Sequence, residues 1–463
     1  MKRWMMALFF LMQGLTACAL YRPEPLAATP SFLEHVPHVT VSADRLLLPE
    51  LRNYPFNPDD GLDMTEVAIL AVVNNPDLRT QRDGRGIARA QLLAAGVLPN
   101  PQMTAGLDHP TTSGPGLMNA FTLGLNYDFG ALVTRPAALG AARAVVDKVD
   151  WGMLWQEWQV VQKARLLFIQ ITEQEKIYRT LQQYRDLLAE RVRRASAALS
   201  EGNLTLDTLA ANLTELQGVE SRLHELNRKN RQGRQDLNAL TGVAPVVQLP
   251  LTGDVHLPDL TSGQVAAALK QLPQRRPDLL ALQAGYTSQE QLFRQAVLAQ
   301  FPSLNLGLTR ARDTSGINTF GFGVTMTLPV FDRNQGAIAI TRATRRQLSD
   351  EYQARLNAAY SEVAALAEQI RLTGEQRQAV LAALPQLETV ARRAKAALDA
   401  GEMEIVQFIG LQSALLEKRL EAQALEQSLL EQRTMLLTLL GNDFSGRNGV
   451  PQIHPVPSGG EIK

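Results

Sequence analysis

Two hydrophobic patterns divide this chain into long and short segments. In the long segments, apolar residues recur at steps of three and four, as they do through 177–199 and again through 408–439. The first of these stripes consists of Ile177, Leu181, Tyr184, Leu188, Ala195 and Leu199. Such steps, sustained over this length, predict α-helices that pack as coiled coils.

The short segments alternate apolar residues with polar or small ones, which predicts β-strands. The apolar positions are Phe121, Leu123, Leu125, Tyr127 and Phe129 in one segment and Phe320, Phe322, Val324, Met326, Leu328 and Val330 in the other. A weaker strand is expected before each, near 103–107 and 304–308. This alternation fits membrane strands with one face toward lipid and one toward a wet lumen, and it also fits strands half-buried in a soluble sandwich.

The same landmarks occur twice, about 200 residues apart and in the same order. Asn-Pro-Asp-Leu at 75–78 returns as Arg-Pro-Asp-Leu at 276–279, and Leu-Thr-Gly at 240–242 returns as Leu-Leu-Gly at 439–441. Repetition of this kind indicates a duplicated structural unit. The predicted organisation is a signal peptide (1–17), a lipidated N-terminal arm (18–60) extended on the surface, repeat 1 (61–242, strand pair near 102–129), a linker (243–260), repeat 2 (261–441, strand pair near 303–330) and a C-terminal tail (442–463).

Each repeat is expected to contain one very long helix. In repeat 1 a helix over 76–97 leads to the strand pair, and the long helix then runs from near Val133 to a turn at Gly202, which Gly401 matches in repeat 2. A helix of roughly 65 residues is about 100 Å long. Glycine supplies the left-handed conformation that a tight reversal between two helices needs.

The N-terminus has the features of an export signal. Lys2 and Arg3 precede a short apolar run, which is followed by Leu-Thr-Ala-Cys at 15–18. This ending resembles a bacterial lipoprotein box, in which Cys18 would carry lipid, and Ala19 after it favours the outer membrane. Cys18 is also the single cysteine, so an intramolecular disulfide is excluded.

Charge and side-chain chemistry indicate neither an enzyme nor a nucleic-acid-binding protein. Lys and Arg total 46 and Asp and Glu total 46, so the net charge offers no attraction to nucleic acid. The six histidines are scattered, and the chain has no phosphate loop or nucleophile elbow. We therefore expect no catalytic residues, no cofactor and no dedicated metal site.

Four strands in one chain cannot close a membrane barrel. An open strand edge in lipid leaves backbone groups unpaired, and the smallest closed barrels have about eight strands. If these strands lie in a membrane, several copies of the chain must share one barrel.

At this point the chain resembles the TolC-like outer-membrane factor family over nearly all of its length. The resemblance rests on the two-repeat layout, the two Pro-Asp-Leu helix starts and the strand-to-helix junction at 328–336. It implies a mainly α fold with a membrane β part: a homotrimer with a twelve-stranded β-barrel that continues into a periplasmic α-barrel. The sequences at 95–101 and 331–336 are most similar to the heavy-metal branch, the CzcC- and CusC-like proteins.

The resemblance also implies partners and a location. The protein would lie in the outer membrane of a Gram-negative bacterium, anchored by lipid and extending into the periplasm. There it would conduct substrate, heavy-metal cations above all, from a periplasmic adaptor and an inner-membrane pump of the RND type. A drug-efflux or type I protein-secretion duct of the same fold stays open as an alternative, as does a periplasmic coiled-coil lipoprotein tether without a pore.

Candidate site residues lie at the helix reversals and at the second strand-to-helix junction. The resemblance assigns adaptor contact to the two turns, at Gly202, Asn203, Gly401 and Glu402, and a gate position to Asp207. Repeat 2 departs from the gate pattern, since Gln407 and Gly410 stand where drug-type ducts carry aspartates. At the junction, Pro329 is expected to end the strand, Asp332 to cap the next helix and Gly336 to allow close packing.

Overall fold

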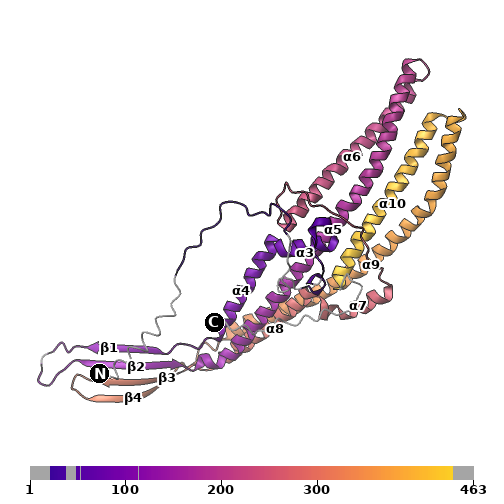
Figure 1. The fold of residues 1–463 in the computed structure, drawn as a ribbon. Coiled ribbons are helices and arrows are strands. Elements are labelled where there is room, and N and C mark those ends of the chain that lie inside the picture. Colours follow the sequence, from indigo (N-terminus) through magenta and orange to yellow (C-terminus); the bar gives the residue numbers. More distant parts are fainter. Residues whose placement is uncertain (1–20, 38–47, 53, 113, 442–463) are drawn as a thin grey trace.

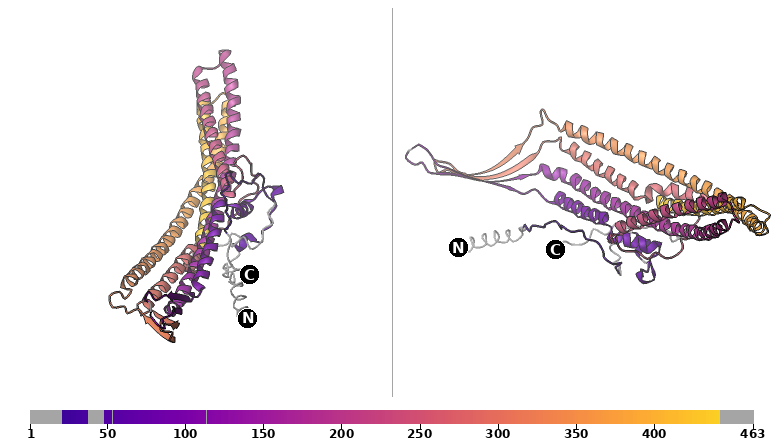
Figure 2. Two further views of the ribbon diagram at one scale, coloured as in Figure 1. Left: turned by 90° about the vertical axis from the view of Figure 1, so that its left-hand side faces the viewer. Right: turned by 90° about the horizontal axis from the view of Figure 1, so that it is seen from above.

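The structure, a computed structural model, describes residues 21–37, 48–52, 54–112 and 114–441. The expected signal peptide, Cys18 and the tail at 442–463 lie outside the described residues. The molecule is elongated, with a sheet at one end and two long helical hairpins that extend to the other (Figure 1). Figure 2 shows the same division from two further sides.

Helices make up most of the chain, and the two longest confirm the expected rods. The α5 helix begins a few residues before the predicted start at Val133 and has 71 residues, and α9 has 65. The helices are α2 (Pro49–Arg52), η2 (Pro58–Asp60), α3 (Met64–Asn74), α4 (Pro76–Gly96), α5 (Gly130–Ser200), α6 (Leu206–Thr241), α7 (Ser262–Arg275), α8 (Pro277–Leu298), α9 (Gln335–Asp399) and α10 (Ile405–Leu440).

Four of these helices were not predicted: the short α2 and η2 of the N-terminal arm, and α3 and α7. The α3 helix is apolar on nearly every side, so it shows no helical stripe, and α7 is short. Both carry a capping box that could have revealed them, with Asp63 and Glu66 at the start of α3 and Thr261 and Gln264 at the start of α7. In both cases a single residue, Asn75 or Arg276, separates the end of the helix from the proline that begins the next one.

The strands form one antiparallel sheet, which together with the long helices confirms the expected fold class. They are β1 (Gln102–Asp108), β2 (Ala120–Asp128), β3 (Leu304–Arg312) and β4 (Asn318–Met326), in the order β1-β2-β3-β4. The β2–β3 pairing joins the two repeats. Because β1 and β4 are the outer strands, each has one edge without a partner strand among the described residues.

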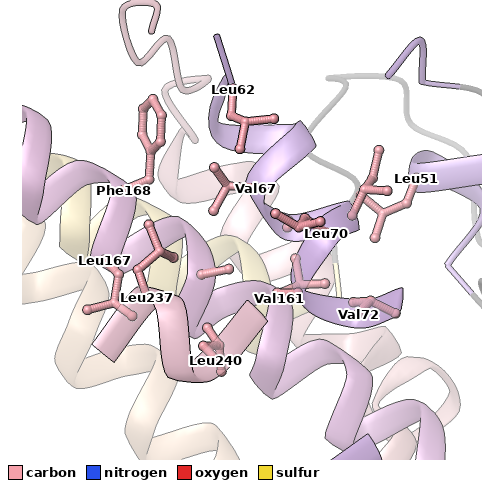
Figure 3. Close-up of a cluster of buried hydrophobic side chains, with 14 of the residues drawn as sticks. Leu51, Leu62, Val67, Leu70, Val72, Val161, Leu167, Phe168, Leu237 and Leu240 are labelled. Carbon is pink, nitrogen blue, oxygen red and sulfur yellow. The ribbon is translucent and has the colours of Figure 1, made fainter. Parts of the chain in front are cut away.

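A hydrophobic core lies where α3 packs between α5 and α6 (Figure 3). Val67, Leu70 and Val72 of α3 are fully buried there against Phe168 and Leu237 of the longer helices. Burial of each such side chain contributes about 1.5–3 kcal/mol. This core thickens the molecule near its middle, between the sheet and the far ends of the hairpins.

The N-terminal arm contributes to this core, contrary to the expectation from its sequence. It was expected to be extended on the surface, yet Leu51 is fully buried and Leu48 nearly so. The arm also pairs with the linker, because Leu33 exchanges backbone hydrogen bonds with Gly242 and Ala244 at 3.0 and 2.9 Å. Apolar residues in an otherwise Pro-rich segment explain the difference, since their burial offsets the entropy of ordering the arm.

Candidate functional site

The register of the sheet places the apolar residues of all four strands on one face. Leu125 lies opposite Met103 on one side and Leu308 on the other, and Leu308 lies opposite Phe322. Directly paired residues of antiparallel strands share a face. In this chain that face is not covered: the exposed fractions of Leu125, Leu308 and Phe322 are 48%, 45% and 65%.

The opposite face carries small and polar residues. Gly124 and Gly307 are paired neighbours of Thr309 and Asn126 on this face. A β-carbon added at Gly124 would collide with the Thr104 hydroxyl, and one at Gly307 would collide with the Asn126 amide oxygen. The glycines therefore leave room for polar side chains of neighbouring strands, which gives the sheet one apolar and one polar face.

At the first strand-to-helix junction, Asp128 supports the start of α5. Its Oδ1 accepts hydrogen bonds from the backbone N–H groups of Gly130 and Ala131 at 2.8 and 3.3 Å. The rings of Tyr127 and Phe129 meet edge to face with their centroids 5.2 Å apart. Asp128 was not among the predicted site residues, although an acidic residue just before a helix is an N-terminal signal.

The second junction differs from the prediction at Asp332 and Gly336. Asp332 does not cap α9: its Oδ1 accepts from the N–H of Asn334 at 2.8 Å, one residue before the helix begins. Within the chain, a β-carbon at Gly336 would meet no atom within 4 Å, so close packing there is not observed. Strand β4 ends at Met326, three residues before Pro329.

Asn334 is the residue that shapes this junction, and it was not predicted from the sequence. It is the one non-glycine residue with a positive φ, 60°, in the described part of the chain. Its amide Nδ2 donates to the Ala296 carbonyl of α8 at 2.8 Å, which ties the start of α9 to α8. Asparagine tolerates the left-handed conformation better than most residues, so an Asn before a helix was the available signal.

The two helix reversals have the same backbone geometry. Gly202 and Gly401 are left-handed, with φ of 76° and 75°. In each reversal, two consecutive backbone N–H groups donate to carbonyl groups of the preceding helix. The donor–acceptor distances are 3.0 Å for Gly202 and 2.8 Å for Asn203, and they are the same for Gly401 and Glu402. All four residues are exposed, and a β-carbon on either glycine would meet nothing.

The gate candidates lie in the first turns of the helices that follow the reversals. Asp207 is exposed in the first turn of α6, and Gln407 and Gly410 are exposed in α10. Phe408, between the latter two, is buried beneath the Arg191 guanidinium, whose carbon lies 4.9 Å from the ring centroid. A buried aromatic residue, which was not among the predicted site residues, therefore lies beside the exposed residues of the second reversal.

Polar contacts tie the two hairpins together below the reversals. Ser413 of α10 donates from its hydroxyl to Glu215 of α6 at 2.7 Å and lies 3.4 Å from the Tyr184 hydroxyl of α5. Burial raises the pKa of Tyr184, so this hydroxyl stays protonated at neutral pH. Further from the reversals, Gln423 donates to Thr180 at 3.1 Å. These contacts set the spacing of the two reversals within one chain.

The two Pro-Asp-Leu motifs start their helices by different means. Asn75 caps α4 through its side-chain oxygen, which accepts from the Leu78 N–H at 3.0 Å. At the equivalent position in repeat 2, Arg276 is fully buried; its guanidinium donates to Asp278 and Glu362 and lies 5.0 Å from the Trp155 ring centroid. The duplicated motif therefore holds a hydrogen-bonded cap in one repeat and a buried ionic network in the other.

The described residues lack two kinds of feature. They contain no group of three or more His, Cys, Asp or Glu side chains that could hold a metal ion. None of the helices in the described ranges is both long and apolar enough to cross a membrane.

Comparison with known proteins gives matches in sequence. Residues 268–442 match the model of the family described as outer membrane efflux protein. The chain is 27% identical over 240 residues to the cobalt-zinc-cadmium resistance protein CzcC of Cupriavidus metallidurans, and this alignment covers 51% of the chain and 56% of CzcC. The chain thus matches about half the length of that relative.

The fold matches solved structures over a larger share of the chain. CusC covers 86% of this chain and 97% of its own length with a TM-score of 0.70 and 18% identity. The outer membrane protein VceC of Vibrio cholerae covers 82% of this chain and 96% of its own length with a TM-score of 0.69 and 17% identity. Repeat 2 thus matches the model of the outer membrane efflux protein family, and the described chain has the fold of these solved structures.

Proposed function

We propose that the protein is a subunit of an outer-membrane efflux channel and acts as a conduit without catalysis. The observation that carries this proposal is the sheet: one uncovered apolar face, one polar face and two unpaired edges, joined directly to long helical hairpins. In lipid, unpaired edges are too costly to persist, so copies of the sheet close on one another. A coiled-coil tether without a pore has no use for such a sheet.

Three copies close the barrel in this proposal, and the helical hairpins of the same copies form the duct below it. The detergent-extracted protein is therefore expected to be a trimer. Light scattering combined with size-exclusion chromatography measures the protein mass in the detergent complex. A uniform monomer or dimer with intact helical content by circular dichroism would contradict the shared barrel.

The proposed substrates are heavy-metal cations. This rests on the CzcC relative, whose name assigns it to cobalt, zinc and cadmium resistance. The cations would pass through the duct as cargo. A periplasmic adaptor and an RND-type inner-membrane pump would deliver them, and lipid on Cys18 would anchor the N-terminal arm in the outer membrane. A duct for drugs or for type I protein secretion is the second candidate, since the fold alone serves each cargo.

The adaptor contact is proposed at the two reversals, on Gly202 and Asn203 and on Gly401 and Glu402. These residues are exposed at the end of the molecule farthest from the sheet (Figure 1). Asp207, with Gln407 and Gly410, is the proposed gate region beside them. Asp207 is the single acidic residue of this proposed gate region, and it belongs to repeat 1. Repeat 2 would therefore contribute no carboxylate to a ring of acidic side chains around the pore.

Valine at both Gly202 and Gly401 is expected to abolish efflux while leaving a trimer in the membrane. The left-handed φ costs a residue with a β-carbon ~1–2 kcal/mol, and nothing nearby would clash, so the effect stays local to the reversals. A deletion strain carrying the variant is scored for trimer in outer membranes and for resistance to zinc, cobalt, cadmium, copper and silver salts and to common drugs.

Asparagine at the same two positions is the matched control, because it adds a side chain yet tolerates the left-handed conformation. The asparagine variant should retain efflux. Full resistance with the valine variant at normal trimer levels would show that the reversals are not the functional contact. A loss of drug tolerance with unchanged metal resistance would favour the drug-efflux candidate.

A further inference from the structure

The apolar face of the sheet carries two charged residues, and both are arginines. Arg310 lies opposite Leu123 and Phe320, and Arg312 lies opposite Phe121, so the register puts both guanidinium-bearing side chains among the apolar residues. The other positions of this face in the four strands are apolar apart from Asn318. The acidic residues of the strands, Asp108 and Asp128, belong to the polar face.

Both arginines lie at the end of β3 that is remote from the helices. Strand β3 starts at Leu304 beside the helical part and reaches Arg312 eight residues later, just before the loop to β4. At about 3.3 Å per residue, the length of strand from Leu304 to Arg312 is close to the height of the apolar band of a membrane barrel, which is about 25 Å. The arginines therefore stand at the outer boundary of the apolar face.

The Arg312 guanidinium is held there by contacts other than a carboxylate. Arg312 lies 5.4 Å from the Phe121 ring centroid and donates from one terminal nitrogen to the Asn119 carbonyl at 3.1 Å, while its buried Nε has no hydrogen-bond partner. The nearest acid along the chain, Asp313, accepts instead from the N–H groups of Ser315 and Ile317, both at 2.9 Å. The ion pairs formed among the described residues include neither arginine.

We propose that Arg310 and Arg312 bind the phosphate groups of the lipid that forms the outer leaflet. Such a lipid has acyl chains, which the apolar residues of the sheet would contact, and phosphate groups, which the two arginines at the edge of that face would bind. Arginine suits this role because its planar guanidinium can form two parallel hydrogen bonds to a phosphate. Aromatic residues commonly line the same level of a membrane barrel, as Phe121 and Phe320 do here.

A second copy of the chain is a poorer occupant for this site. Copies meet at the free edges of β1 and β4, whereas β3 is an inner strand of the sheet. The acid of the neighbouring β1, Asp108, would also lie on the polar face, away from the arginines. Closure of the barrel would therefore leave three such sites facing outward. This inference rests on the proposed function, because it needs the sheet to span the membrane.

The test measures binding of lipid A to the purified detergent-solubilised protein by microscale thermophoresis. The probes are bisphosphorylated lipid A, the same lipid after removal of both phosphates, and inorganic phosphate. The R310Q/R312Q variant should bind bisphosphorylated lipid A about thirtyfold more weakly than the unchanged protein, from two lost charge contacts. The R310K/R312K variant should keep most of the affinity, and the dephosphorylated lipid should bind all variants weakly.

The matched control is R392Q/R393Q, which removes two exposed arginines from α9 near the opposite end of the molecule and should bind like the unchanged protein. Equal affinity of R310Q/R312Q and the unchanged protein for bisphosphorylated lipid A would overturn the inference. The inference would also be overturned if the unchanged protein bound the dephosphorylated lipid as tightly as bisphosphorylated lipid A. If inorganic phosphate alone bound tightly, the ligand of this site would be the free ion and not the lipid.

Membrane assembly separates this inference from the proposed function. If the unchanged protein does not insert into outer membranes as an oligomer, the proposed function fails. If it inserts and the glutamine pair binds lipid A normally, only the lipid site fails. If the R310Q/R312Q variant does not assemble, the role of the phosphates is still tested on the unchanged protein, by comparing its affinities for bisphosphorylated and dephosphorylated lipid A.

Discussion

Arginine at Leu125 or Val324 is expected to destabilise the membrane-inserted protein by about 2–4 kcal/mol in each case. Both residues lie within their strands on the uncovered apolar face, where Leu125 pairs with Met103 and Val324 pairs with Leu306. A charge at this depth has to be removed from water, and the neighbouring apolar side chains offer no partner. The yield of trimer in outer membranes and its resistance to urea in detergent measure the effect.

Thr325→Arg is the control, because it adds the same side chain one residue away on the opposite face. Thr325 is exposed and lies opposite Asn305, in the row that also contains Asp128. A water-filled lumen should tolerate the added charge there. Equal membrane yields for the Leu125, Val324 and Thr325 variants would contradict the assignment of one face of the sheet to lipid and the other to water.

Removal of the Arg276 side chain is expected to have the second large effect, about 3–5 kcal/mol of unfolding free energy for Arg276→Ala. This guanidinium is fully buried, and its loss leaves the carboxylates of Asp278 and Glu362 with Arg355 as their shared partner. It also removes the cation over the Trp155 ring. Chemical denaturation of the purified protein, followed by circular dichroism, measures the change.

Arg371→Ala is the control for this second prediction. Arg371 is exposed on α9 and pairs with Glu368 and Glu375 of the same helix, so it resembles Arg276 in the number of acidic partners and differs in burial. Exposed pairs of this kind contribute little to stability. If both variants unfolded at the same denaturant concentration as the unchanged protein, the buried network would have no structural role.

Much of the fold could be predicted from local pattern because strands and helices have different periods. Alternation at 121–129 and 320–330 located β2 and β4, and the stripe from Ile177 to Leu199 lies within α5. The left-handed glycines at 202 and 401 could be predicted because a helix reversal needs a conformation that side chains with a β-carbon disfavour. The gate positions could not be fixed in this way, since exposed residues in a first helical turn carry no distinctive pattern.

Local pattern failed where a residue acts through a distant partner. Asp332 was expected to cap α9, but Asn334 takes the left-handed position and bonds to Ala296, 38 residues earlier in the chain. Nothing in the sequence at 332–336 specifies that contact. The same holds for Arg276, whose partner Glu362 lies on another helix.

The sequence by itself determined which segments are strands, how long the helices are and where the chain reverses, because each depends on neighbours within a few residues. The tertiary structure alone decided that β2 pairs with β3 and in which register. That pairing places Arg310 and Arg312 on the apolar face, and it depends on contacts between residues almost 200 positions apart, for which a single sequence carries no local signal.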